Sequence, residues 1–348
     1  MRLSDFDFDL PSHLIAQHPR PRGESRLLVV NRATGSITES TVAELPDWLT
    51  PGDLLVANDS RVFPARLLGR RRGGGRAECL LLEEQDDGTW WALVNPGQRL
   101  PVGATITCED AERTPGVTLT IEIIDRDDRG RRRVRLVPES GSPLEAIERL
   151  GHIPLPPYIQ REDTAEDRDR YQTVFAQDRG SIAAPTAGLH FDESLLTRLA
   201  SAGIARTTVT LHVGYGTFKP VTVDDIRDHR VDAERWRVSP EAAAAMREAR
   251  ASGRRVVAVG TTTTRALESA AAATGAVEAG GGRTQLCILP GHAFAAVDAL
   301  MTNFHLPKSS LLLLVSAFAG RDLVLEAYRE AVRRQFHFYS YGDAMLIL

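Results

Sequence analysis

The stretch that decides the fold runs from Ser239 to Ala273 and reads SPEAAAAMREARASGRRVVAVGTTTTRALESAAAA. Ser239 is a favoured N-cap residue, Pro240 suits the first helical position and Gly253 suits a stop, so the sequence predicts a helix between them. The apolar run RRVVAVG then predicts a buried strand, and the threonines that follow form a loop passing into a second helix. This order of helix, strand, loop and helix is typical of an α/β domain.

Both ends of the chain share this α/β character. The segment GDLLVAND at 52–59 predicts a buried strand that ends at Asn58 and Asp59. A second helix–strand–loop–helix unit is expected over residues 292–320. The apolar C-terminus AMLIL predicts a final strand that completes the sheet, with Asp343 near its start.

The middle of the chain is built differently, from short strand-like segments. AECLLLEE and TWWALV are separated by QDDG, a hairpin signal with Gly88 at the turn, and ATITCED, VTLTIEIID and RRRVRLVP follow. Five or six short strands with turn signals predict a small barrel or sandwich. We therefore expect a discontinuous α/β domain made of residues 1–62 and 150–348, with an all-β domain inserted at 63–149.

The composition is that of a folded globular protein. The chain has 348 residues, of which 43% are apolar and 25% charged, and its net charge is −4. This charge excludes a histone-like polycation, but it leaves a nucleic-acid partner open because binding depends on local clusters.

Cysteine usage and hydropathy indicate a reducing compartment and no membrane segment. Cys79, Cys108 and Cys287 are far apart, and no CxxC pair or Cys/His cluster occurs, which predicts neither disulfides nor a thiolate metal site. The N-terminus lacks an apolar signal core. The longest apolar run, 311–319, is interrupted by Ser316 and is too short to span a bilayer. We expect a cytoplasmic protein.

Arginine accounts for 40 of the 42 basic residues and gathers in two groups. The first group has no acidic residue among positions 61–76 and comprises Arg61, Arg66, Arg70, Arg71, Arg72 and Arg76. The second comprises Arg129, Arg131, Arg132, Arg133 and Arg135. Residues 63–149 nevertheless hold 14 arginines against 15 acidic residues. Such groups can contact a few phosphates, or they can be the solvated surface of a protein from an arginine-rich proteome.

Polar residues gather where apolar strands end, which is where α/β folds place ligands. Each such segment alone can be a turn, a helix cap or the site of a structural histidine, but together they favour an enzyme pocket over a binding scaffold. The six segments are NDSR at 58–61, GSIAAPTAGLHF at 180–191, TLHVGYGTF at 210–218, GTTTTR at 260–265, TNFHLPK at 302–308 and SYGDAM at 340–345.

Longer stretches around these segments carry a resemblance. NDSRVFPARL, HIPLPPYIQREDTAEDRDRYQTVFA, GSIAAPTAGLHF, TLHVGYGTFKPV, TNFHLPKSSLLLLVSAFAG and SYGDAM occur in this order. Together they closely resemble the S-adenosylmethionine:tRNA ribosyltransferase-isomerase family of queuosine biosynthesis. The resemblance extends from DFDFDLPSHLIAQHP, near the N-terminus, to the last residues.

The resemblance implies a fold and a reaction. The fold is a large α/β-barrel domain with a small all-β barrel domain inserted. The enzyme acts in the bacterial cytoplasm on tRNA that carries 7-aminomethyl-7-deazaguanine at the wobble position. It transfers and isomerises the ribosyl moiety of S-adenosylmethionine onto that base, which gives epoxyqueuosine-tRNA, adenine and methionine. S-adenosylmethionine is then a co-substrate, no metal is needed, and we expect a monomer.

Three positions depart from the family pattern. HRVDAE at 229–234 has Asp232 where the family has a second histidine, and the role of that position here is open. His292 replaces a tyrosine, which retains a hydrogen-bonding group but loses the phenol. Thr263 replaces a serine and keeps the hydroxyl.

The implied reaction asks for particular side chains. A base must remove the ribose C5′ proton that the sulfonium acidifies, an acid helps adenine leave, and the attacking amine must lose a proton. The acid–base candidates are His190, His212 and His305, and which is acid or base stays open. The carboxylates that could steer the amine or the sulfonium are Asp59 and Asp343.

Substrate contacts complete the hypothesis. Arginine binds carboxylates bidentately, so Arg61 and Arg265 are candidates for the methionine carboxylate. The other expected substrate-binding residues are Gly214, Gly216, Thr217, Thr261, Thr262 and Asn303. The expected tRNA phosphate contacts are Arg70, Arg71, Arg72, Arg76, Arg131, Arg132 and Arg133. The alternatives are a non-catalytic RNA-binding protein and an S-adenosylmethionine enzyme with another acceptor.

Overall fold

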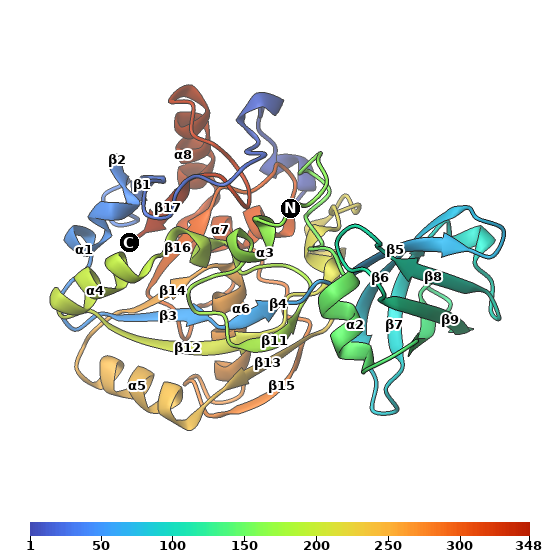
Figure 1. Ribbon diagram of the computed structural model, residues 1–348. Coiled ribbons are helices and arrows are strands. Elements are labelled where there is room, and N and C mark those ends of the chain that lie inside the picture. The colour runs from blue at the N-terminus through green and yellow to red at the C-terminus, as the bar shows by residue number, and fades with distance from the viewer. The chain divides into compact units, whose positions relative to one another are not determined.

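The computed structural model describes residues 1–348, with the exception of the side chain of Phe218. That side chain belongs to the predicted segment 210–218 and lies outside the described residues. The chain forms two compact units (Figure 1). One comprises Met1–Arg61, Pro157–Arg161 and Arg170–Leu348, and the other comprises Val62–Pro156 and Glu162–Asp169. Each unit is described by itself.

The larger unit is built on a nine-stranded mixed sheet, which confirms the predicted α/β class. In spatial order its strands are β15 (Gly280–Thr284), β13 (Glu234–Val238), β12 (Ala205–Leu211), β3 (Leu54–Asn58), β14 (Val256–Val259), β16 (Ala299–Asn303), β17 (Ala344–Ile347), β1 (Arg26–Val30) and β2 (Ile37–Thr41). A separate two-stranded sheet pairs β11 (Asp178–Ser181) with β4 (Ser60–Val62).

The strand directions bring many strand ends to one edge of this sheet. β3 pairs in parallel with both β12 and β14, and β14 pairs in parallel with β16. β17 runs antiparallel to β16, and β1 runs parallel to β17. The carboxyl ends of β3, β12, β14 and β16 therefore lie at the same edge as the amino ends of β17 and β1. We call this the polar edge.

Helices cover both faces of the sheet, and two apolar clusters fill the space beneath them. Val256 and Ala258 of β14 belong to the cluster that includes side chains of α5 (Pro240–Ala251), α6 (Thr261–Ala271), α7 (Ser310–Ala319) and α8 (Arg321–Arg333). Val257 and Val259 belong to the cluster under α1 (Leu45–Trp48) and α4 (Glu193–Ser201). A strand whose alternate residues enter two cores reads as a continuous apolar run, as this one does. The short helix α3 spans Asp167–Arg170.

Local signals account for the start of α5 and for one incorrect expectation. The Ser239 hydroxyl accepts a hydrogen bond from Ala242 N at 3.1 Å, so the predicted N-cap is confirmed. The unit expected over 292–320 contains β16 and α7, but the helix expected before β16 is wrong. The backbone N–H groups of Ala295 and Ala296 donate instead to the buried carboxylate of Glu268, each at 2.9 Å. They are therefore not available for the backbone hydrogen bonds of an α-helix.

The smaller unit contains a closed six-stranded barrel, as the short strands predict. Its strands in order are β10 (Arg132–Pro138), β7 (Trp90–Asn95), β6 (Arg76–Glu84), β5 (Arg66–Arg71), β8 (Thr105–Glu109) and β9 (Thr118–Arg126). The hairpin between β6 and β7 turns at Gly88, and the helix α2 (Pro143–Leu150) follows β10. Alternating residues such as Ile106, Cys108 and Ile121 are fully buried.

Gly69 permits the barrel to close between β5 and β8. A Cβ atom at this position would lie 2.4 Å from Thr107 O and 2.8 Å from Cys108 Sγ. We predict that Gly69→Ala lowers the free energy of unfolding of the barrel by about 1–3 kcal/mol, because the strands must move apart. Urea unfolding of the whole protein, followed by the fluorescence of Trp90 and its neighbours, measures this change.

Gly97→Ala is the matched control for this prediction. A Cβ at Gly97 would have its nearest neighbour, Arg132 Nη2, at 3.9 Å, so the substitution should leave the unfolding midpoint unchanged. If Gly69→Ala unfolds at the wild-type midpoint, the close approach of β5 and β8 is not a constraint on the barrel.

Candidate functional site

The polar edge brings together all six polar segments that the sequence singles out. Asp59 follows β3, His212 follows β12 and Thr261 follows β14. Asn303 is the last residue of β16 and lies opposite Ala344, the first residue of β17. The segment 180–191 joins them because His190, at the end of a 3₁₀ turn (Thr186–His190), bonds to Asn303.

Asn58 holds the centre of this edge. Its side-chain oxygen accepts from Leu211 N and Ser60 N, both at 3.0 Å. Its amide nitrogen donates to Leu211 O at 2.9 Å and to Thr262 Oγ1 at 3.3 Å. The side chain is buried, so these four bonds fix how β12 and α6 leave the sheet. Sequence analysis identified Asn58 only as a strand end.

Asp59 and His212 lie on the neighbouring strand ends. The Asp59 carboxylate accepts from Thr210 Oγ1 at 2.7 Å and from Thr208 Oγ1 at 3.0 Å. His212 Nε2 lies 3.7 Å from an oxygen of Asp178. Burial lowers the pKa of His212, an effect that Asp178 partly opposes.

The other nitrogen of His212 is unusual. Its Nδ1 is buried and has no hydrogen-bond partner among the described residues. Gly180 lies against it, and a Cβ atom at that position would be 2.6 Å from Nδ1. Because Asp178 faces Nε2, the proton is favoured there, and Nδ1 is left with a free lone pair.

His190 is a neutral, fully engaged imidazole. Its Nε2 faces the Asn303 amide nitrogen at 3.1 Å, and its Nδ1 faces Ser25 Oγ at 2.9 Å. Burial lowers its pKa to about 4. The Asn303 amide nitrogen also donates to Tyr339 O at 3.0 Å. Since that nitrogen is the donor, Nε2 accepts and Nδ1 carries the proton.

His305 turns into the fold rather than toward a ligand. It is 6% exposed, its Nε2 lies 2.9 Å from Thr302 Oγ1, and its backbone N–H donates to Tyr328 Oη at 3.1 Å. Burial lowers its pKa to about 3. These contacts hold His305 in the fold, and the acid–base role expected for it stays a prediction.

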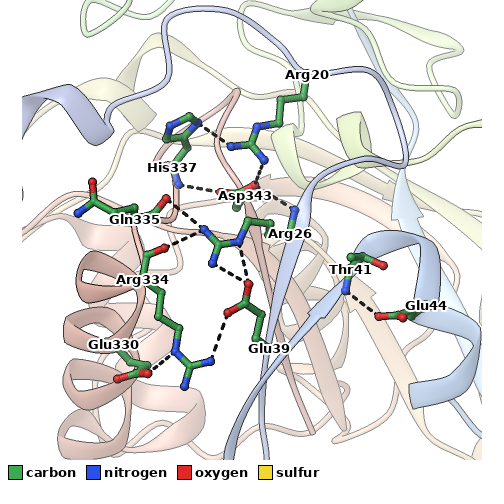
Figure 2. A network of polar contacts seen from close by, with 10 residues as sticks. All are labelled: Arg20, Arg26, Glu39, Thr41, Glu44, Glu330, Arg334, Gln335, His337 and Asp343. Atoms are coloured by element: carbon green, nitrogen blue, oxygen red, sulfur yellow. Dashed lines mark hydrogen bonds and ion pairs between the residues drawn. The ribbon is translucent and has the colours of Figure 1, made fainter.

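Asp343 is likewise built into the fold, at the amino end of β17. Figure 2 shows its carboxylate between Arg20, the backbone of Arg26 and His337. It accepts from Arg26 N at 3.0 Å and from His337 N at 2.7 Å, and Arg20 Nη1 lies 3.3 Å away. The side chain is completely buried. Asp343 therefore fixes the start of the strand, and its expected role in steering a substrate stays a prediction.

The network of Figure 2 continues outward from β1. The Arg26 guanidinium pairs with Glu39 of β2 at 2.6 Å, and Arg334 at the end of α8 pairs with the same carboxylate at 3.2 Å. These partly exposed charges tie the sheet edge to the helix.

A buried ion pair forms the wall of a pocket beside the polar edge. The guanidinium of Arg265 bonds to the carboxylate of Glu234, and its Nε donates to Leu286 O at 3.0 Å. The second Glu234 oxygen accepts from Gly214 N at 2.8 Å and from Thr217 Oγ1 at 3.2 Å. Arg265 Nη2 is buried without a hydrogen-bond partner among the described residues.

The pocket holds about 440 Å³ of empty space, open solvent included. Arg265, Glu234, Thr217 and Gly216 line its polar side, and apolar residues that include Leu311 line the rest. An arginine whose Nη2 donors are unused, beside apolar walls, can bind the carboxylate of a partly apolar ligand.

Asp232, one of the departures from the family pattern, also lines this pocket. Its carboxylate pairs with Lys219 Nζ at 2.7 Å. The other two departures have internal partners. His292 Nε2 lies 3.3 Å from Glu268, and the Thr263 hydroxyl donates to Val259 O at 2.6 Å.

The remaining substrate-binding candidates differ in accessibility. Arg61 is exposed between buried neighbours on β4. Thr261 is buried at the first position of α6, after Gly260, whose φ of 93° lies in the left-handed region. Such a φ favours glycine, so the helix begins with its N–H groups directed at the polar edge.

The barrel arginines differ in exposure and in their partners. Arg70, Arg72 and Arg76 are exposed around the β5–β6 hairpin, and Arg71 is half-buried. Arg131 and Arg133 pair with Asp127 and Asp87, each at 2.7 Å.

Arg132 has a different role from the one expected. It is 4% exposed and donates to the carbonyl oxygens of Leu100, Gly130 and Gly97 at 2.7–3.0 Å. Its guanidinium therefore holds barrel loops together instead of facing a phosphate.

Sequence reasoning missed several residues of the site. Glu234 was noted only as part of HRVDAE, although it binds Arg265 and the GYGT loop together. Asp178 and Ser25 were not singled out, and nothing in the local sequence marks them as neighbours of His212 and His190. Among the described residues, no group of three or more His, Cys, Asp or Glu is placed to hold a metal ion. No described helix combines the length and hydropathy needed to cross a bilayer.

Comparison with known proteins gives consistent matches over the whole chain. The family described as "Queuosine biosynthesis protein" matches residues 3–347. The S-adenosylmethionine:tRNA ribosyltransferase-isomerase of Anaeromyxobacter dehalogenans (strain 2CP-1) is 54% identical, with 100% of this chain and 99% of the relative covered. The protein of the same name from Aquifex aeolicus is 48% identical, with both chains fully covered.

A solved structure also matches. The crystal structure of the S-adenosylmethionine tRNA ribosyltransferase from Thermotoga maritima is 38% identical and superposes with a TM-score of 0.56. The match covers 99% of this chain and 100% of the other.

The buried histidines predict a pH dependence of stability. In the unfolded chain a histidine titrates near 6.5, whereas burial lowers the pKa of His190 to about 4 and of His305 to about 3. As the pH falls, these histidines therefore bind protons in the unfolded chain before they do so in the folded protein. Stability is complete above pH 6.5 and falls below it by about 1.4 kcal/mol per pH unit for each histidine, until the pH reaches the folded pKa.

The measurement is urea unfolding between about pH 7.5 and 5. His305→Gln should reduce the slope of unfolding free energy against pH by about 1.4 kcal/mol per unit, whatever its stability at neutral pH. His13→Gln, at an exposed histidine, is the matched control. A His305→Gln slope equal to that of the wild type would show that His305 is not buried in its neutral form.

Proposed function

Because the chain belongs to the queuosine biosynthesis family of S-adenosylmethionine:tRNA ribosyltransferase-isomerases, we propose that it catalyses that family's reaction. It transfers and isomerises the ribosyl moiety of S-adenosylmethionine onto 7-aminomethyl-7-deazaguanine at the tRNA wobble position. The products are epoxyqueuosine-tRNA, adenine and methionine. The observation that carries the proposal is the whole-chain match together with the convergence of six polar segments at one sheet edge. We propose a cytoplasmic monomer that uses no metal.

We propose that the larger unit, close to the expected domain of residues 1–62 and 150–348, binds S-adenosylmethionine. The pocket beside Arg265 takes the methionine part, whose carboxylate pairs with the unused Nη2. Thr217, Gly214 and Gly216 form the adjacent wall, and Thr261 and Thr262 the start of α6. Arg61, exposed on β4, is the second candidate for the carboxylate.

His212 is the acid–base group that the geometry favours. Its lowered pKa keeps the ring neutral, and its Nδ1 has a lone pair with no partner among the described residues. Such a nitrogen can take the C5′ proton, leaving the electron pair on the carbon beside the sulfonium. Asp59, on the next strand end, supplies a negative charge that favours the sulfonium or the protonated amine. His190 acts as a positioning residue for Asn303.

We propose that the inserted barrel contributes to tRNA binding. A wobble base lies in a single-stranded loop and can leave its stack to enter a pocket. The exposed Arg70, Arg72 and Arg76 are the best candidates for phosphates of the anticodon arm. Arg131 and Arg133 already have carboxylate partners and should contribute less.

The function is tested by adenine release and by mass spectrometry of the wobble nucleoside. We expect the protein to release adenine from S-adenosylmethionine when the tRNA carries the aminomethyl base, and to form epoxyqueuosine. His212→Asn should slow adenine release by about 10²–10⁴-fold, the usual contribution of a general base, without weakening tRNA binding. His13→Asn, at an exposed histidine outside the six polar segments, is the matched control.

The outcomes separate the alternatives. Tight tRNA binding without adenine release would support a non-catalytic RNA-binding protein. Adenine release that does not depend on the modified tRNA would indicate another acceptor. Wild-type turnover by His212→Asn would exclude His212 as the base.

The barrel arginines predict the salt dependence of tRNA binding. Each lost phosphate contact should reduce the slope of log affinity against log salt by roughly 0.7–0.9. The combined variant Arg70→Ala, Arg72→Ala, Arg76→Ala should therefore lower that slope by about 2 or more, as measured by fluorescence anisotropy over a salt series. Arg133→Ala should change it little, because Asp87 already neutralises this side chain. Equal slopes for the combined variant and the wild type would remove the hairpin from the tRNA interface.

A further inference from the structure

Tyr339 has a backbone conformation that bulky residues rarely adopt. Its φ is 76°, and the other non-glycine residues with positive φ are Lys308 and Gln335. An aromatic residue in the left-handed region is strained, and such strain persists where the surrounding structure imposes it, often at functional sites.

The polar edge imposes this conformation. Tyr339 N donates to Phe304 O at 3.0 Å, and Tyr339 O accepts from Gly342 N at 2.9 Å. The same carbonyl accepts from the Asn303 amide at 3.0 Å. Three hydrogen bonds therefore fix the Tyr339 backbone to the end of β16, at the point where Asn303 meets His190.

The ring of Tyr339 forms half of an aromatic pair. It is half-buried and packs against Tyr158, with ring centroids 3.7 Å apart and planes inclined by 44°. The Tyr158 hydroxyl bonds to Ser340 Oγ, which holds this second ring in place. Neither tyrosine is fully buried, so the pair lies partly accessible beside the polar edge.

A second observation is an unused hydrogen-bond acceptor on Asn303, the residue whose amide nitrogen bonds to the Tyr339 backbone. Asn303 is 2% exposed, and its Oδ1 has no hydrogen-bond partner among the described residues. The amide cannot be reversed to satisfy it, because the nitrogen faces the carbonyl oxygens of Tyr339 at 3.0 Å and Ser340 at 3.5 Å. A buried acceptor without a donor calls for an explanation, and a ligand N–H group provides one.

An aromatic surface and an adjacent acceptor match the chemistry of a nucleobase. Bases stack on aromatic side chains through their faces and present N–H donors at their edges. We propose that Tyr339, backed by Tyr158, stacks against the purine-type base of a substrate, and that Asn303 Oδ1 accepts a hydrogen bond from an N–H group of the same base.

This inference rests on the proposed function, which supplies two such bases. One is the adenine of S-adenosylmethionine, and the other is the 7-deazaguanine of the tRNA. The chemistry of recognition is the same for both, and the experiment distinguishes them.

If the role of Tyr339 were purely structural, its replacement would affect stability and not substrate binding. Asparagine tolerates the left-handed region better than tyrosine does, so Tyr339→Asn relieves backbone strain while it removes the ring. If the ring only filled space, its loss would change stability and leave substrate affinity unaltered. Gln335→Asn relieves strain at an exposed left-handed position outside the site and is the matched control.

The test measures steady-state adenine release with each substrate varied in turn, and the thermal midpoint of every variant. Tyr339→Asn should raise the KM of one substrate by roughly 10-fold, the value of one base stack, with a smaller change in kcat. Tyr339→Phe should keep the KM close to the wild-type value, because the phenyl ring still stacks. Gln335→Asn should match the wild type.

Direct binding measurements show which of the two bases stacks on Tyr339. Weaker binding of S-adenosylmethionine alone to Tyr339→Asn, by calorimetry, identifies adenine. Unchanged S-adenosylmethionine binding with weaker binding of tRNA bearing the aminomethyl base identifies the deazaguanine. Wild-type KM values and affinities for both substrates in a folded Tyr339→Asn protein would overturn the inference. An inactive but folded wild type would instead contradict the proposed function.

Discussion

The parallel pairing of β3 with β12 on one side and with β14 on the other is the constraint on which the polar edge depends. The register sets Asn58 opposite Val209 and Ala57 opposite Val259, so the three strands end at neighbouring levels. A slip of one residue would exchange the side chains that enter the two cores, and burial on both faces therefore fixes the register. The Asn58 side chain extends the pairing beyond the last backbone bonds, because it bonds both the N–H and the C=O of Leu211.

Burial at this edge also decides what the histidines can do. His190, His212 and His305 all have a lowered pKa because burial disfavours the charged ring. A neutral imidazole can accept a proton or orient a neighbouring side chain. Which of these it can do depends on whether both of its nitrogens already have hydrogen-bond partners. His190 has partners at both nitrogens, whereas His212 retains a free Nδ1. The acid–base role that we propose for His212 and the positioning role that we propose for His190 thus rest on the second nitrogen of each ring.

Local sequence predicts those parts of the molecule that depend on local physics. The apolar run before Asn58, the Ser239 cap and the QDDG hairpin each became the expected element, because propensity and burial agree there. The expectation before β16 failed because the carboxylate of Glu268, 27 residues earlier in the chain than Ala295, takes the N–H groups that a helix would need. For His305 and Arg132 the structure shows internal partners that the sequence does not reveal. A histidine or an arginine in the sequence suggests a base or a phosphate ligand. Only the tertiary structure shows that His305 contacts Thr302 and that Arg132 donates to the carbonyl oxygens of Leu100 and Gly97.

The Arg265–Glu234 pair illustrates how tertiary structure can adapt a charge to the ligand that we propose for this pocket. S-adenosylmethionine carries a sulfonium, an ammonium and one carboxylate, so an isolated buried guanidinium would attract the carboxylate but repel the rest of the molecule. Glu234 offsets that repulsion and at the same time fixes the guanidinium plane, since its other oxygen is held by Gly214 and Thr217. The N–H groups of Nη2 remain without a partner and are available to the proposed ligand. A paired arginine therefore gives the pocket directional recognition of a carboxylate with little net charge, which an unpaired arginine at the same position would not provide.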